Sequence, residues 1–391
     1  MSAPADYPFN EGPGLDLSER YAEARRGPGL RRVRLPYGDP AWLVTRYADA
    51  RSVLADPLFS RAACVANDEP REAPGQVNRG LLAMDPPDHT RLRRLLAKAF
   101  TVQRMERMRP EVRALAERLA DDMVAAGQPA DLVESFALPL PVTVICRLLG
   151  VPEADLPLFR RWSDDAVSSS VSAQEAEASI LRFHAYMSDL VAERRERPGD
   201  DLMTALIEAR DNEDRLSEAE LFEQCVGLLI AGHESTATSI PAFLYTLFQH
   251  PEQMERLREE PELIPAAVEE LLRYVPLRGG ALAARWATRD VEVGGTLVRE
   301  GEPVVVSVGS ADRDAERFPD PDTLDFERPA NQHMGFGHGV HYCPGSALAR
   351  LEIQEALRAL LLRVPGLRLA GGLVWRSRMS LRGLREMPVG W

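Results

Sequence analysis

Apolar residues recur at helical spacing through most of the centre of this chain. From Asp88 to about Tyr274 they follow the 3.6-residue period of amphipathic helices. Residues 62–83 look like an irregular loop, and shorter strand-like runs lie mainly towards the two ends. Helices in the middle and strands late, without regular βαβ alternation, predict a mainly α fold with small β-sheets. The expected outlying elements are a helix over 47–54 and strands within 32–36, 41–45, 291–295, 303–308 and 367–391.

One predicted helix is long enough to cross a whole domain. Ser217 and Glu220 form the capping-box pattern that starts a helix, and Pro251 ends it after His250. At 1.5 Å per residue such a helix is about 50 Å long.

The centre of this helix contains residues that weaken it. Gly232 costs about 1 kcal/mol relative to alanine. The hydroxyls of Ser235 and Thr236 can bond back to the backbone, and Pro241 removes one helical hydrogen bond. Because Glu234 lies beside these hydroxyls, the helix centre is a candidate site.

A glycine-rich segment at residues 336–345 places Cys343 just before another helical run. Backbone N–H groups at the start of a helix stabilise a thiolate. A thiolate with nothing to pair with suits a metal that takes one protein ligand, such as haem iron. The other cysteines, Cys64, Cys146 and Cys225, have no glycine frame and are interpreted as small buried apolar residues.

Composition narrows the class of protein. The 391 residues are 45% hydrophobic and 27% charged, as in ordinary globular proteins. Four cysteines without paired spacing indicate a reducing compartment. With neither a secretory signal nor a membrane-length apolar run, we expect a cytoplasmic protein that does not bind membranes. A net charge of −13 argues against nucleic-acid binding. Against this trend, residues 91–113 hold eight basic residues and two acids, either a solvated helix face or a docking patch for an acidic electron donor.

The spaced residues of the cysteine segment resemble the haem-ligand loop of the cytochrome P-450 family. The set is Phe336, Gly337, Gly339, His341, Cys343 and Gly345. The order of elements resembles the family over essentially the whole chain, which implies one catalytic unit over residues 1–391. The resemblance implies haem b, with Cys343 as the axial thiolate, between the long central helix and the cysteine loop.

The resemblance also implies which residues surround the haem and deliver protons. His89 and Arg93, four residues apart on one helix face, would contact the propionates with Arg285 and His341. Glu234, Ser235 and Thr236 would serve proton delivery, with Ser235 standing where the family usually has threonine. The implied cofactor-binding residues are His89, Arg93, Ala231, Gly232, Arg285, Phe336, Gly337, His341, Cys343 and Gly345.

Three further charged residues are assigned to structure. Glu270 and Arg273 lie three apart on one helix face. In the family this pair is buried with a downstream arginine, for which Arg328 is the candidate here.

The implied activity is insertion of one oxygen atom of O2 into a bulky small molecule, or its oxidative coupling, in secondary metabolism. Macrolides, cyclic dipeptides and terpenes are all candidate substrates. The chain shows no flavin or nicotinamide module, so we expect ferredoxin and ferredoxin reductase to supply electrons from NAD(P)H. Two alternatives remain: a peroxide-using or non-oxygenating haem-thiolate enzyme, and a non-catalytic haem-binding protein or sensor. Candidate substrate contacts are Leu82, Leu229, Gly279, Gly280, Ala281 and Met379.

Overall fold

The computed structural model describes residues 3–10, 14–72, 80–158, 173–199, 201–211, 217–278, 282–376 and 381–391. It is mainly helical with small sheets, which confirms the predicted fold class. The α-helices are α1 (Glu19–Arg26), α2 (Tyr47–Ala55), α3 (Asp88–Ala99), α4 (Val102–Ala126), α5 (Pro139–Leu149), α7 (Ala173–Glu196), α8 (Leu202–Asp211), α9 (Glu218–Gln249), α10 (Pro251–Glu259), α11 (Ile264–Tyr274), α12 (Val308–Ala311) and α13 (Ser346–Arg363).

Short turns of helix lie in the connections. Two of them, η1 and η2, occupy parts of residues 62–83, which the sequence pattern predicted to be irregular. A single 3-10 turn is too short to show a 3.6-residue period, so the pattern could not reveal it. These turns are η1 (Ala62–Val65), η2 (Gly80–Ala83), the π-helical η3 (Val133–Ala137), η4 (Glu153–Asp155), η5 (Pro261–Leu263) and η6 (Gly339–His341).

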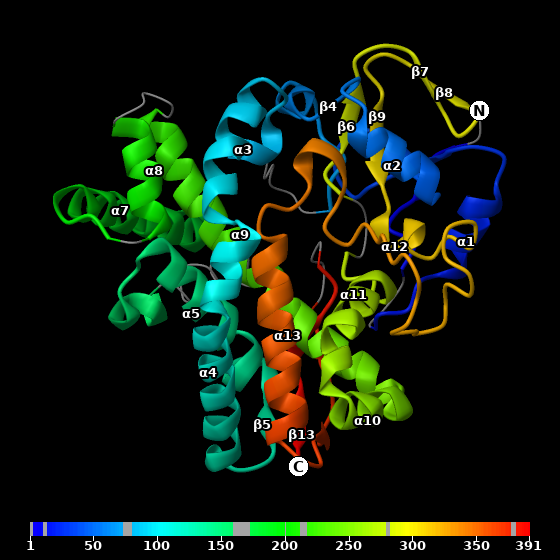
Figure 1. Ribbon diagram of the computed structural model, residues 1–391. Helices are drawn as coiled ribbons and strands as arrows, with labels where there is room; N and C mark the ends of the chain where they lie inside the picture. The colour runs from blue at the N-terminus through cyan, green and yellow to red at the C-terminus, as the bar shows by residue number, and fades with distance from the viewer. Residues whose placement is uncertain are drawn as a thin grey trace.

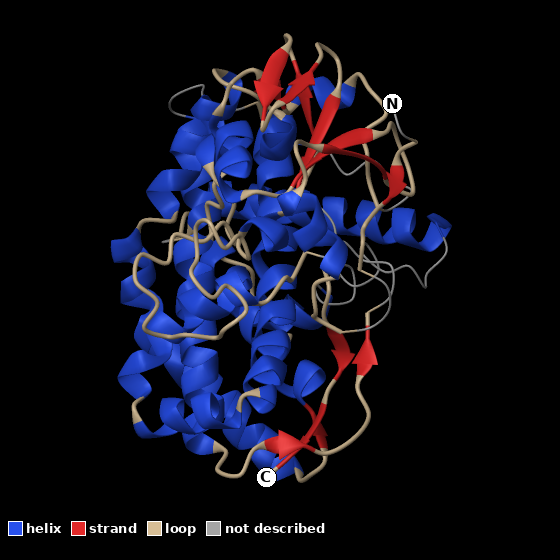
Figure 2. Cartoon of the chain, turned by 90° about the vertical axis from the view of Figure 1, so that its right-hand side faces the viewer, coloured by secondary structure: helices blue, strands red, loops and turns tan. Residues whose placement is uncertain are grey.

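The strands gather at one end and along one edge of the helical body (Figure 2). A six-stranded sheet in the described residues has the order β1-β2-β3-β9-β6-β4. Strand β3 pairs in parallel with β9, so the start of the chain is joined to the region after residue 300. The strands are β1 (Ala5–Asp6), β2 (Arg31–Arg34), β3 (Ala41–Val44), β4 (Phe59–Ser60), β5 (Ala130–Asp131), β6 (Arg285–Ala287), β7 (Val291–Val293), β8 (Thr296–Val298), β9 (Pro303–Val306), β10 (Arg368–Leu369), β11 (Val374–Trp375), β12 (Leu384–Glu386) and β13 (Pro388–Gly390).

Helix α9 begins as the sequence predicted. The Ser217 hydroxyl accepts from the Glu220 N–H at 3.1 Å, and the Glu220 carboxylate accepts from the Ser217 N–H at 2.8 Å. The helix runs without interruption to Gln249, with Pro241 inside it. It crosses behind α4 and α13, which stand side by side in Figure 1. Packing against α5 and α13 sustains the helix across the one backbone hydrogen bond that proline cannot make.

Gly232 has a packing role that the sequence analysis did not foresee. A Cβ atom at this position would lie 2.7 Å from Cγ1 of Ile145 on α5, closer than carbon atoms approach. The missing side chain therefore lets α5 and α9 come close together. The close contact with α5 therefore explains the glycine at position 232, without any need for a weakened centre of α9.

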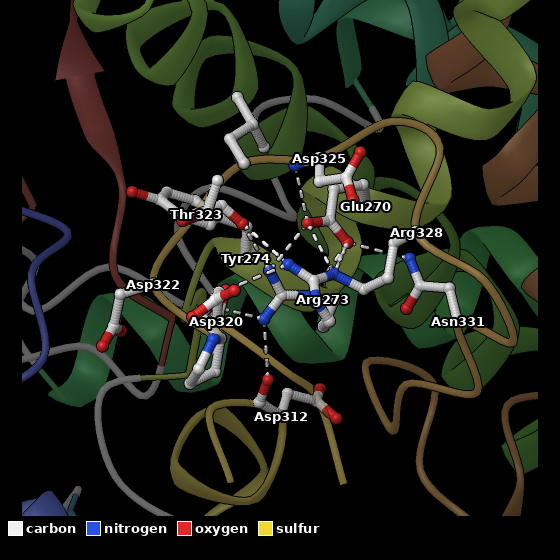
Figure 3. Close-up of polar contacts among 12 residues, drawn as sticks. Glu270, Arg273, Tyr274, Asp312, Asp320, Asp322, Thr323, Asp325, Arg328 and Asn331 are labelled. Atoms are coloured by element: carbon white, nitrogen blue, oxygen red, sulfur yellow. Dashed lines mark hydrogen bonds and ion pairs between the residues drawn. The ribbon is translucent and has the colours of Figure 1, made fainter. Parts of the chain in front are cut away.

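A buried carboxylate joins α11 to the loop that precedes the cysteine segment (Figure 3). Glu270 accepts from Arg273 at 2.7 and 2.8 Å and from Arg328 at 3.1 Å. The side chains of all three residues are at most 5% exposed. Arg273 also donates to three main-chain carbonyls of this loop, those of Asp312, Pro321 and Thr323.

Removing the charge of Glu270 should destabilise the fold strongly. Glu270→Gln keeps the shape but leaves two buried guanidinium groups without their carboxylate, which costs about 3–5 kcal/mol. Glu255→Gln is the matched control, because Glu255 pairs with Arg258 at the same i,i+3 spacing while remaining exposed. That variant should lose less than about 1 kcal/mol. Urea unfolding followed by circular dichroism measures both, and equal losses would contradict a stabilising role for the buried network.

Candidate functional site

The cysteine loop turns tightly before α13. Gly337 and Gly339 adopt φ angles of 77° and 72°, which favour glycine. A Cβ at Gly339 would lie 2.2 Å from the carbonyl oxygen of Leu54, so the loop sits directly on the end of α2. The Cys343 N–H donates to the Phe336 carbonyl at 2.9 Å. Gly345 is different, because its φ of −84° is open to any residue and a Cβ there would meet no protein atom within 4 Å.

The Cys343 sulfur lies among positive charges. Burial raises the pKa of the thiol, whereas the Gly345 N–H and the guanidinium groups of Arg93, Arg278 and Arg350 act to lower it. The predicted N–H donor from the helix start is therefore present at one residue, Gly345. Burial disfavours the anionic form of the sulfur, whereas these donors and cations favour it. A metal ion bound to the sulfur would favour it further.

Arg350 is itself held in place. It donates to Glu269 at 2.6 and 2.9 Å and to the Tyr342 hydroxyl at 3.2 Å. Its guanidinium carbon lies 4.5 Å from the centre of the Phe336 ring. Although burial acts to raise the pKa of Glu269, hydrogen bonds from His333 and Arg350 lower it to about 2. Glu269 is therefore ionised at neutral pH and compensates much of the charge of Arg350.

Four groups with unused hydrogen-bonding capacity face the same region. His89 on α3 and His341 on η6 have ring centroids 4.3 Å apart, and the buried Nε2 atom of each lacks a hydrogen-bond partner among the described residues. Burial lowers the pKa of both rings, that of His341 to about 3. Burial also lowers the pKa of Arg93 and Arg285, and neither guanidinium makes an ion pair within the described ranges.

These residues fit a large ligand that carries acidic groups. A buried polar atom without a partner is costly, so donors left unpaired in this way are suited to an absent acceptor. The two propionates of a haem would provide such acceptors for His89, Arg93, Arg285 and His341. Cys343 lies within electrostatic range of Arg93.

One face of α9 is open in the middle of the molecule. Gly227, Ala231 and Ser235 are spaced four apart and exposed, although α9 lies within the helical core. Positions four apart share one helix face, so this stripe borders accessible space beside α9, which is called the chamber below. The Ser235 hydroxyl donates to the Ala231 carbonyl at 3.4 Å, a long bond that it can exchange for another partner.

The structure separates the other residues predicted for proton delivery. Thr236 is 2% exposed and lies on a different face of α9. Burial raises the pKa of Glu352 on α13 well above its ordinary value, whereas the Thr236 hydroxyl, which faces that carboxyl group, acts to lower it. The expectation that Thr236 shares the site with Ser235 is wrong, because adjacent helix residues point about 100° apart. Glu234 forms an ion pair with Arg376, which lies just after β11.

The predicted substrate contacts are only partly described. Leu82 on η2 is exposed at 59%. Leu229 is 3% exposed within the helical core, so its assignment to the pocket is wrong. An apolar run on a helix buried on most sides does not show which face is open. Gly279, Gly280, Ala281 and Met379 lie outside the described residues.

Two arginines at this site were not among the predicted site residues. Arg278 lies within electrostatic range of Cys343, and Arg376 is the partner of Glu234. Neither belongs to a motif. Arg278 precedes the glycines that were assigned to the pocket, which is the only sequence signal for it. Arg376 is 142 residues from Glu234, too far for any local pattern to reveal.

The chain resembles known proteins over its whole length. The cytochrome P-450 family profile matches residues 172–364. The mycinamicin IV hydroxylase/epoxidase of Micromonospora griseorubida is 52% identical, covering 99% of both chains. The nocardicin C N-oxygenase of Nocardia uniformis subsp. tsuyamanensis is 48% identical, covering 98% of both. The solved structure of the mixed-function P-450 MycG superposes over 100% of both chains at 52% identity, with a TM-score of 0.96.

The chain belongs to the cytochrome P-450 family, and membership of this family implies a haem-thiolate cofactor. It is a monooxygenase that uses O2 and a small-molecule substrate, which confirms the predicted activity. Across the described helices, none combines the length and apolar character that crossing a membrane requires.

Proposed function

We propose that the Cys343 thiolate would bind the iron of a haem b and that His89, Arg93, Arg285 and His341 would hold its propionates. The convergence of unpaired donors near Cys343 carries this proposal. Bound there, the haem iron supplies O2 activation, and its thiolate ligand favours O–O cleavage. Phe336, Gly337 and Gly345 shape the loop beside the cofactor, and the chain acts as one catalytic unit.

Ser235 is the residue placed to handle protons at the chamber. Its hydroxyl is exposed on the open face of α9 and is held only by the long bond to Ala231. A proton donor must lie within hydrogen-bond reach of the reacting oxygen, directly or through one water. Glu234 plays a less direct part, because its carboxylate is occupied by Arg376 and must leave that partner before it can pass on a proton.

Electrons reach the haem from NAD(P)H through a ferredoxin reductase and a ferredoxin that docks on the basic segment 91–113. Only some of the basic residues in this segment have charges that a partner could use. Arg91 pairs with Glu220, and both Arg109 and Arg113 pair with Glu355, so these charges are largely compensated within the protein. Arg94 on α3 and Arg107 on α4 are exposed and make no ion pair among the described residues. Among the side chains that the structure describes, Arg94 and Arg107 are thus available to an acidic partner.

The substrate is a small molecule of biosynthetic origin. The names of two relatives refer to mycinamicin IV and to nocardicin C. They show that closely similar chains act at carbon and at nitrogen atoms of natural products. We therefore place this protein in the tailoring of a secondary metabolite, in the cytoplasm, where reduced ferredoxin is available.

Replacing Cys343 tests the ligand assignment directly. Cys343→Ala should abolish the red-shifted CO band of the reduced protein, because that band requires a thiolate on the iron. Turnover should be lost with it. Cys64→Ala is the control, since Cys64 is a buried core residue, and it should keep both. A red-shifted CO band that survives in Cys343→Ala would show that another residue binds the iron.

Replacing Ser235 tests proton delivery. A positioned proton donor contributes on the order of 100-fold or more to the rate of a proton transfer. Ser235→Ala should therefore divert most electrons to hydrogen peroxide, while the CO spectrum stays unchanged. The measurement is hydrogen peroxide released per NADPH consumed. It uses as substrate a compound whose binding shifts the Soret band. Ser239→Ala removes a similar hydroxyl one turn away, where it is buried and bonded to the Ser235 carbonyl, and should leave the ratio unchanged. An unaltered ratio in Ser235→Ala would mean that protons arrive by another route, such as a substrate hydroxyl.

Reversing the free cations tests the docking surface. Arg94→Glu combined with Arg107→Glu should slow reduction by a plant-type ferredoxin about tenfold or more and flatten its dependence on ionic strength. Arg109 is unsuitable for reversal, because it would leave the buried Glu355 facing a like charge. Arg299 is exposed just after β8, so Arg299→Glu is the control. That variant should be reduced by ferredoxin at the wild-type rate. Stopped-flow spectroscopy measures the rate of haem reduction at several ionic strengths. If the double variant keeps both the rate and its dependence on ionic strength, the ferredoxin docks on another surface.

A further inference from the structure

Arg350 on α13 is tied to α11 by a two-point ion pair. Its guanidinium donates to Glu269 through Nε at 2.6 Å and through Nη2 at 2.9 Å, the paired geometry that matches a carboxylate. Glu269 directly precedes Glu270, and adjacent helix residues point about 100° apart. Glu270 therefore serves the buried network, while Glu269 faces α13, against which α11 packs.

The same guanidinium also contacts the cysteine segment at two places. Its carbon atom lies 4.5 Å from the centre of the Phe336 ring, which is within the range of a cation–π contact. Its Nη1 donates to the Tyr342 hydroxyl at 3.2 Å. The Phe336 carbonyl accepts from the Cys343 N–H at 2.9 Å, and Tyr342 precedes Cys343 in the chain. Arg350 is thus fixed against two residues that are directly joined to Cys343.

His333 fixes the carboxylate of Glu269 from another direction. The His333 ring lies with Nε2 3.1 Å from Oε2 of Glu269, and its Nδ1 accepts from the Gly335 N–H at 3.0 Å. A ring nitrogen that accepts a hydrogen bond carries no hydrogen, so the hydrogen of a neutral ring is on Nε2 and points to Glu269. The His333 side chain is 3% exposed. Glu269 therefore keeps an anchor that does not depend on Arg350.

The two charges of this pair are placed differently with respect to the sulfur. Arg350 touches the cysteine segment itself, whereas the hydrogen bonds of Glu269 within the described residues go to Arg350 and His333. The side chains of Arg350 and Glu269 are 28% and 30% exposed, so solvent screens them only in part. The positive charge of Arg350 favours an anionic Cys343 sulfur. A cation is thus held next to the segment, with its counterion behind it.

We propose that Arg350 raises the reduction potential of the bound haem and that Glu269 limits this effect. Reduction adds one electron, which the ferredoxin supplies, to the unit formed by the iron and its thiolate. A fixed positive charge nearby stabilises the added negative charge, and a carboxylate behind that cation weakens the stabilisation. The inference rests on the proposed haem-thiolate function and adds to it the residues that set how readily the iron accepts its first electron.

Removing the two charges one at a time tests the inference. The reduction potential of the holoenzyme is measured by dye-mediated redox titration, followed in the Soret band, without ferredoxin or substrate. Arg350→Gln should lower the equilibrium constant for reduction about three- to tenfold, which is about 30–60 mV for one electron. Glu269→Gln should raise it by a similar factor, because it leaves the charge of Arg350 uncompensated. The potential of the double variant should fall between those of the single variants.

Arg363 provides a matched control on the same helix. It donates to Asp121 at 2.6 and 3.0 Å, so it forms the same kind of two-point pair. At 1.5 Å per residue, α13 carries Arg363 about 20 Å beyond Arg350. Arg363→Gln and Asp121→Asn should therefore keep the wild-type potential. Arg350→Lys keeps the charge without the planar donors, and it should shift the potential less than Arg350→Gln does.

The outcomes that contradict the inference are distinguishable. Shifts of the same sign in Arg350→Gln and Glu269→Gln, or shifts no larger than those of the Arg363 control, would show that the pair only holds the loop. If Arg350→Gln loses the red-shifted CO band, Glu269→Gln still decides, and a potential that does not rise in that variant overturns the inference. A wild-type protein without the red-shifted CO band would mean that the haem-thiolate proposal itself has failed.

Discussion

The buried carboxylate of Glu270 is the constraint on which the position of the cysteine loop depends. It accepts hydrogen bonds from Arg273, Arg328, Asn331 and the backbone of Asp325 (Figure 3). A buried charge is tolerated only when its partners surround it, so the loop from residue 312 to residue 331 has a single acceptable course across α11. The cysteine segment starts from the end of that loop. A contact far from the chemistry thus decides where the sulfur lies.

Helix α9 combines two functions that require opposite surfaces. On one side it packs closely, and Gly232 allows α5 to approach. On another side Gly227, Ala231 and Ser235 leave an open stripe along the chamber. Because small residues occur on both sides, the same residue type permits tight packing at one position and space for a ligand at another. The hydroxyl of Ser235 is thereby presented to the chamber from a rigid support.

Electrostatics divides the chamber into regions. Histidine and arginine donors gather around one region and suit the acidic edge of a haem, while Arg350 and Arg376 are compensated by carboxylates. Charges enclosed by protein act more strongly than they do in water, so the placement of these donors favours a ligand with acidic groups.

Local patterns in the sequence were enough to predict the mainly α fold, the Ser217 cap, the course of α9, the glycine-framed Cys343 and the pairing of Glu270 with Arg273. Each of these depends on residues within about one or two helical turns, where spacing alone determines geometry. The tertiary structure alone decided that Leu229 and Thr236 face the core and that Arg376 reaches Glu234. A helix that is apolar on most sides does not reveal its open face, and partners more than a hundred residues apart leave no common pattern. These features depend on which elements pack together, and that is settled only when the whole chain folds.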